Sequence, residues 1–229
     1  IAGLIAVYAM AGDKNKSNQM IQLAMTRNID KGVNAGSVMV IYTAGLSALM
    51  SGQAQQALQY FNQAFLIANK LNHEVEKNRI LVSAADAYAK LGDYQNSFQS
   101  AQKSHDFYKK IGNDWMDMKT HSQMGEALLN LGQSQQAIDN FNSAIGFAQK
   151  LGDKETQILS LFGLGMVYRN SQDYANSLQC LTQALNLAEE TDDKDSQKFV
   201  LNEMGNIYEK SGDKKKAKEF RDKAKKIKN

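Results

Sequence analysis

The sequence repeats itself every 40 residues. At each repeat a turn dipeptide interrupts a pattern of helical spacing. The six dipeptides are Gly12-Asp13, Gly52-Gln53, Gly92-Asp93, Gly132-Gln133, Gln172-Asp173 and Gly212-Asp213. A fixed period in this range is typical of a solenoid, in which each unit buries its apolar face against its neighbours. The period therefore predicts an extended stack of units with exposed surfaces, and it argues against a closed catalytic pocket.

Small side chains recur in register with these turns. Two columns hold only Ala or Ser, and a third holds Gly or Ala with Ile5 as its one exception. The columns are Ser17, Ala57, Ser97, Ala137, Ser177 and Ala217; Ala24, Ala64, Ser104, Ala144, Ala184 and Ala224; and Gly45, Ala85, Gly125, Gly165 and Gly205. Antiparallel helices approach closely only where side chains are small. We therefore predict an all-α chain of about six antiparallel helix pairs.

The turns set the boundaries of the predicted helices. First helices of the pairs are expected at 1–11, 34–51, 74–91, 114–131, 154–171 and 194–211. Second helices are expected at 15–28, 54–71, 94–110, 134–151, 174–190 and 214–227. Asp93, Asp173 and Asp213 stand directly before second helices, where a carboxylate accepts hydrogen bonds from unpaired backbone N–H groups. These aspartates are predicted to be helix caps and not catalytic residues.

The same columns resemble the tetratricopeptide repeat family over essentially the whole chain. The matching positions of the fifth unit are Leu161, Leu164-Gly165, Tyr168, Asp173-Tyr174, Ser177, Leu181 and Ala184. The resemblance implies a right-handed superhelical solenoid. The chain departs from the family in its period of 40 instead of about 34 residues, and in its lack of proline. This longer variety is similar to the repeats of the spindle-orientation adaptor Pins/LGN, of kinesin light chain and of bacterial regulators.

We predict a single solenoid domain over residues 1–229. Its units are about 1–31, 32–71, 72–111, 112–151, 152–191 and 192–229. Helix 214–227 is Lys-rich and polar on its outer side, as the last helix of a solenoid should be. The first helix is apolar on nearly every side, so we expect more repeat, another domain or a partner next to Ile1.

Motifs for chemistry are missing from the sequence. His73, His105 and His121 fall in different units without the spacing of a zinc site, and the single Cys180 allows no disulfide within the chain. We therefore predict no catalytic residue, metal or cofactor, and no enzyme. No apolar run reaches the about 18 residues that span a membrane, and a cytoplasmic location is predicted. We expect a monomer or weak homodimer.

Residues 213–229 contain nine Lys and Arg against three acidic residues, within a net charge of +3 for the whole chain. A basic helix of this kind can bind phosphates on nucleic acid or anionic lipid. No recognised nucleic-acid motif accompanies it. We favour a solvated cap, and a nucleic-acid partner is not expected.

The resemblance also implies a binding surface, because first helices line the concave face of tetratricopeptide repeat solenoids. The aligned lining residues are Met39, Tyr42, Leu46, Arg79, Val82, Asp86, Lys119, Glu126, Leu159, Phe162, Met166, Arg169, Phe199, Asn202 and Asn206. Apolar ends and a charged middle favour an amphipathic helix or an extended peptide with large side chains. The alternative is that these side chains pack between repeats.

Two classes of function follow. The first is a non-catalytic scaffold or adaptor that binds a protein or peptide segment in the groove. The second is a peptide-sensing regulatory domain that controls an attached or associated output domain.

Overall fold

The computed structural model describes residues 15–16, 19–20, 23 and 34–227. The predicted helix 1–11 lies outside the described residues, and helix 15–28 lies largely outside them. The expected apolar face beside Ile1 and its upstream continuation also lie outside. Among the described residues all regular structure is α-helical, which confirms the all-α prediction.

Within residues 34–227, ten helices of 13 to 18 residues follow the 40-residue period. They are α3 (Ala35–Met50), α4 (Ala54–Lys70), α5 (Glu74–Lys90), α6 (Tyr94–Lys110), α7 (Asp114–Asn130), α8 (Ser134–Leu151), α9 (Lys154–Asn170), α10 (Tyr174–Glu190), α11 (Lys194–Lys210) and α12 (Lys214–Lys226). Each lies within one residue of its predicted range at both ends. The turn dipeptides are therefore sufficient to locate the helices.

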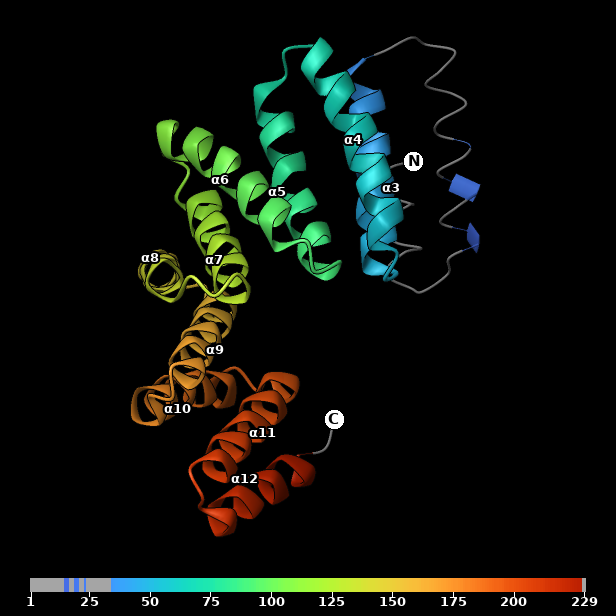
Figure 1. Ribbon diagram of the computed structural model, residues 1–229. Helices are drawn as coiled ribbons and strands as arrows, with labels where there is room; N and C mark the ends of the chain where they lie inside the picture. Colours follow the sequence, from blue (N-terminus) through green and yellow to red (C-terminus); the bar gives the residue numbers. More distant parts are fainter. Residues whose placement is uncertain (1–14, 17–18, 21–22, 24–33, 228–229) are drawn as a thin grey trace. The chain divides into compact units, whose positions relative to one another are not determined.

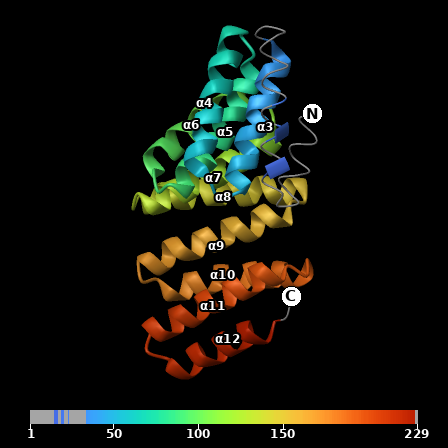
Figure 2. The same cartoon turned by 90° about the vertical axis from the view of Figure 1, so that its right-hand side faces the viewer.

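The helices fall into two compact units, which are described separately. The first ends at Ile111 and holds α3 to α6, and the second begins at Gly112 and holds α7 to α12 (Figure 1). In each unit consecutive helices pack as pairs, and within the second unit α8 to α12 follow one another in successive layers (Figure 2). A single solenoid domain over residues 1–229 remains a prediction.

The small columns lie at the helix contacts. The five described members of the first column and those of the second are at most 4% exposed. In the third column, each glycine faces the residue sixteen positions later on the second helix of its pair. A Cβ atom on Gly125 would lie 2.8 Å from the ring of Phe141, and one on Gly165 would lie 3.1 Å from Leu181. Glycine is required there because the second helix carries a bulky residue.

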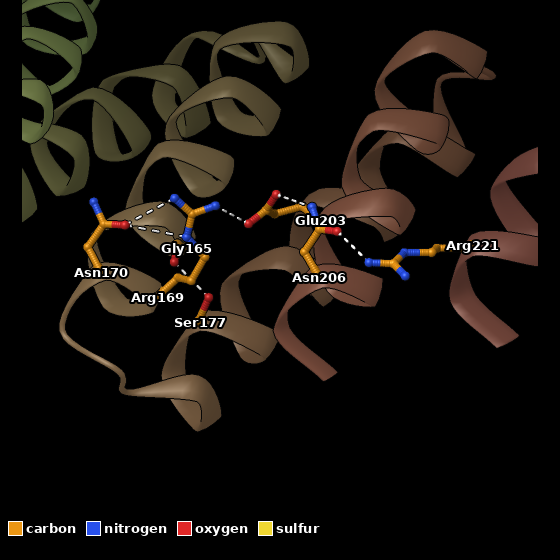
Figure 3. Close-up of polar contacts among 7 residues, drawn as sticks. All are labelled: Gly165, Arg169, Asn170, Ser177, Glu203, Asn206 and Arg221. Carbon is orange, nitrogen blue, oxygen red and sulfur yellow. Dashed lines mark hydrogen bonds and ion pairs between the residues drawn. The ribbon is translucent and has the colours of Figure 1, made fainter. Parts of the chain in front are cut away.

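Serine replaces alanine in some of these columns and ties the two helices of a pair together. The Ser97 hydroxyl donates to the Ala85 carbonyl at 2.9 Å, and the Ser177 hydroxyl donates to the Gly165 carbonyl at 2.7 Å (Figure 3). Both serines are buried, so the bond also satisfies a hydroxyl that would otherwise be costly to bury.

The predicted caps are confirmed. The carboxylates of Asp93, Asp173 and Asp213 accept the backbone N–H three residues later, at 3.2, 3.1 and 3.0 Å. Gln53 and Gln133, at the same turn position, make no such side-chain bond. Glutamine has a longer side chain, so its amide oxygen does not return to the first turn as an aspartate oxygen does.

The residue before each cap adopts a left-handed backbone. Gly52, Gly92, Gly132 and Gly212 have φ between 74° and 91°, and Gln172 occupies the same position with φ 63°. Glycine adopts this region without steric cost, whereas other residues lose about 1 kcal/mol.

Replacing Gln172 by glycine should therefore raise the free energy of unfolding by about 0.5 kcal/mol, after the greater freedom of glycine in the unfolded chain is subtracted. Urea denaturation followed by circular dichroism measures the change. The control is Ser171→Gly, because Ser171 has a right-handed φ of −85° and that variant should lose stability. A loss of stability in Gln172→Gly would contradict the strain argument.

Candidate functional site

The predicted lining residues lie on first helices of both units. Met39, Tyr42 and Leu46 are on α3, and Arg79, Val82 and Asp86 are on α5. In the second unit the residues on α7, α9 and α11 are Lys119, Glu126, Leu159, Phe162, Met166, Arg169, Phe199, Asn202 and Asn206. Each unit therefore offers its own set of candidate residues.

In the first unit two of these residues belong to the core. Tyr42 is 9% exposed and Val82 is 2% exposed. The Tyr42 hydroxyl lies 2.9 Å from the Ser83 hydroxyl, which links α3 to α5. Burial raises the pKa of Tyr42, and the hydrogen bond with Ser83 opposes that shift only in part. Tyr42 and Val82 therefore pack within the core of the first unit, and a contact of either residue with a ligand stays a prediction.

Met39 and Arg79 come together with Tyr42 on the same side of these helices. The Arg79 guanidinium lies 5.0 Å from the centre of the Tyr42 ring, and its Nη2 donates to the Met39 sulfur at 2.9 Å. A cation over an aromatic face is attracted by the electron density of the ring. The cluster therefore fixes α3 against α5, while Leu46 and Asp86 are half-buried beside it.

In the second unit, large apolar side chains are exposed on two neighbouring first helices. Leu159 on α9 is 55% exposed and Phe199 on α11 is 63% exposed. The rings of Phe162 and Phe199 lie 4.7 Å apart between their centres, so the two helices share one aromatic contact. Met166 is half-buried one turn further along α9. We refer to Leu159, Phe162, Met166 and Phe199 as the α9–α11 patch.

A polar network joins α9, α11 and α12 beyond this patch. The Arg169 guanidinium forms an ion pair with Glu203, whose other oxygen accepts from the Asn206 side-chain amide at 3.1 Å. Arg221 donates to the Asn206 side-chain oxygen at 3.0 Å (Figure 3). Glu203 is only 9% exposed, so Arg169 supplies the charge that its burial requires.

The network engages two residues that the repeat alignment placed in the groove. Arg169 and Asn206 each contact partners within the chain, whereas Asn202 is exposed on α11. Glu203 and Arg221 were missed. Glu203 carries the only charge in an aligned column of otherwise neutral residues, and that signal in the sequence could have identified it.

The remaining lining residues lie on α7. On α7, Lys119 is half-buried and Glu126 is exposed. Within the part of the chain that the structure describes, no group of three or more His, Cys, Asp or Glu could hold a metal ion. Cys180 is buried, and that burial raises the pKa of its thiol. The same described residues include no helix with the length and apolar character needed to cross a membrane.

A family model described as tetratricopeptide repeat matches residues 155–229. Residues 155–229 carry tetratricopeptide repeats. The match covers α9 to α12 and so includes the α9–α11 patch and the polar network. A search of curated proteins with the sequence found no match.

Solved structures share the architecture of these tetratricopeptide repeats. Aspartyl phosphate phosphatase F from Bacillus subtilis has a TM-score of 0.72 and 19% identity, over 82% of this chain and 49% of its own. A Rap protein complexed with Competence and Sporulation Factor has a TM-score of 0.77 and 18% identity, over 91% and 58%. Kinesin light chain TPR-like repeats from Podosopora anserina have a TM-score of 0.67 and 17% identity, over 82% and 92%.

At these identities the similarity concerns the fold. The chain spans about half the length of the first two proteins. The kinesin light chain and Rap structures confirm the predicted helical repeat architecture.

Proposed function

We propose that the chain is a non-catalytic interaction scaffold that binds an apolar segment of a partner protein on the α9–α11 patch. The observation that carries this proposal is the exposure of Leu159 and Phe199, at 55% and 63%, on adjacent helices. Apolar side chains that gather at one exposed place mark interaction surfaces more often than single exposed ones do. The tetratricopeptide repeat architecture, which presents first helices as a surface, supports the same function.

The contacts of the patch favour an aromatic-rich or leucine-rich ligand. Phe162 holds the Phe199 ring at 4.7 Å, so less side-chain freedom is lost when a ligand covers that ring. Aromatic residues of this kind carry a large share of the energy at interfaces. The ion pair between Arg169 and Glu203 provides a fixed polar border at one end.

The test is the double variant Leu159→Asp with Phe199→Asp. Both side chains are exposed, so the fold should be retained and the circular dichroism spectrum should be unchanged. An apolar ligand that covers the patch would bury the two new carboxylates, which is unfavourable. Partner binding should therefore weaken by about 30-fold or more. Affinity capture with quantitative mass spectrometry identifies partners bound by the wild-type protein, and calorimetry with the purified partner measures the affinity.

Leu66→Asp is the matched control, because Leu66 is 61% exposed on α4 in the first unit. That variant should bind the partner as the wild-type protein does. If the double variant also keeps full affinity for every captured partner, the patch is not the binding surface.

A second candidate function is peptide sensing, in which a bound peptide changes the arrangement of repeats and thereby controls an output domain. The similarity to the Rap structure, which is complexed with a named factor, supports this candidate. A peptide ligand that binds the patch and changes the radius of gyration in solution scattering would favour sensing. Binding without such a change would favour the scaffold. The cytoplasmic location and the monomeric or weakly homodimeric state remain predictions.

A further inference from the structure

A separate groove lies in the first unit between the second helices α4 and α6, with α5 as its floor. Its volume is about 240 Å³. Phe61 and Phe65 of α4 and Leu81, Ala84 and Tyr88 of α5 form apolar walls and floor. Asn62, Gln99, Ser100 and Lys103 add polar groups along the side formed by α4 and α6.

The repeat alignment explains why this groove is open. The floor residue Ala84 aligns with Leu164 in the second unit. Leu164 is buried. The floor of the groove in the first unit therefore lacks a large side chain that the equivalent position in the second unit carries.

The groove is distinct from the predicted lining surface of α5. An α-helix turns by about 100° per residue, so Leu81, Ala84 and Tyr88 share one side of α5. Arg79 and Asp86 lie on the roughly opposite side, with the cluster that fixes α3. A ligand in the groove would thus leave that cluster untouched.

The size and charge of the groove indicate what it would bind. A volume of about 240 Å³ is below the range of about 300–1,000 Å³ for small-molecule sites, and it suits one large side chain. Among the described residues Lys103 forms no ion pair. The two helices that flank the groove are basic, because α4 contains no Asp or Glu and α6 carries three lysines against one aspartate, while acidic and basic residues balance on α5.

We propose that this groove binds an acidic peptide segment through a single aromatic anchor. The anchor ring packs between Phe61, Phe65 and Tyr88, and offset or edge contacts between rings add to the gain from burial. A carboxylate of the peptide, next to the anchor, pairs with Lys103. The side-chain amides of Asn62 and Gln99 exchange hydrogen bonds with the N–H and C=O groups of the peptide backbone. This site is independent of the α9–α11 patch.

The test uses a fluorescently labelled hexapeptide with one central Trp and four Asp or Glu residues, titrated against the full chain by anisotropy. Two further peptides replace the Trp by Ala or the acidic residues by Lys. We expect the acidic Trp peptide to bind at least about tenfold more tightly than either. Ala84→Leu, which copies Leu164, and Lys103→Glu should each weaken its binding by about tenfold or more.

Phe199→Asp is the matched control and should leave the affinity for the acidic Trp peptide unchanged. A failure of the proposal for the α9–α11 patch can thus be told apart from a failure of the proposal for the groove. Lys103→Glu changes an exposed position and keeps the test valid if Ala84→Leu folds poorly. Absence of binding at about 1 mM peptide, or equal binding by wild type and Lys103→Glu, would overturn the proposal.

Discussion

Phe141→Ala should lower the free energy of unfolding by about 3–5 kcal/mol. Phe141 is 2% exposed on α8. Its ring lies between the backbones of two other helices, because added Cβ atoms on Gly125 of α7 and Gly163 of α9 would approach it to 2.8 and 2.4 Å. The substitution leaves a cavity that three rigid helices cannot readily close. Urea or thermal denaturation of the full chain measures the loss.

The glycines beside the ring supply a second, more specific expectation. Gly163→Ala alone should destabilise the protein by about 1–2 kcal/mol. The new methyl group overlaps the ring, and the cost of that overlap exceeds the free energy gained from alanine's higher helix propensity. In the Phe141→Ala background the overlap is gone, and the same substitution should be stabilising. A double-mutant cycle measures this change of sign.

Phe199→Ala is the matched control for Phe141→Ala, because it removes the same ring from a site that is 63% exposed. Its expected cost is about 1 kcal/mol or less. Equal losses for the two variants would show that the ring of Phe141 is not confined between helices as described.

Arg169→Met should cost about 2–4 kcal/mol of unfolding free energy. The substitution keeps an unbranched apolar stem, although a shorter one, and leaves the Glu203 carboxylate, which is 9% exposed, without its cationic partner. Adding Glu203→Gln to Arg169→Met should recover part of the loss, because the neutral amide is less costly to bury and still contacts Asn206. Chemical denaturation of the single and double variants measures both values.

The ion pair between Arg221 and Glu209 provides a control for this second prediction. Both side chains are more than a third exposed, so the pair is screened by water and Glu209→Gln should change stability far less than Arg169→Met does. A hydrogen bond from Arg221 lowers the pKa of Glu209. Its small contribution should therefore be present at neutral pH and disappear as the pH falls through that lowered pKa. A large loss in Glu209→Gln would contradict this division between buried and exposed pairs.

The helices and their contacts could be predicted from the sequence, because the signals are local and repeat. A turn residue such as Gly92 and a cap such as Asp93 fix one boundary each, and six copies of the pattern reinforce one another. The small columns were located for the same reason, since a contact such as Gly125 against Phe141 recurs at one spacing.

The partners of individual side chains could not be predicted. The repeat alignment placed Tyr42 and Asn206 on the lining face. Part of such a face is covered by the next helix, and neighbouring side chains decide which residues are covered and which stay exposed. Tyr42 is buried by the packing of α3 against α5, and Asn206 is held by Arg221 from α12. The groove between α4 and α6 was missed because its floor is Ala84, where the second unit has Leu164, and a repeat pattern does not reveal the effect of one missing side chain.

The contacts between the glycine column and the residues sixteen positions later affect how segments of such a chain can be recombined. Gly45, Gly125 and Gly165 each face a bulky residue sixteen positions on, whereas Ala85 is followed at that spacing by Ala101. A crossover inside a helix pair would combine Ala85 with a Phe or a Gly with Ala101, which produces an overlap or a hole. Exchange of complete 40-residue modules keeps each of these couples together, although a contact such as Phe141 with Gly163 crosses the junction between two pairs. Recombination and grafting should therefore disturb fewer contacts with junctions between pairs than with junctions at the turn inside a pair.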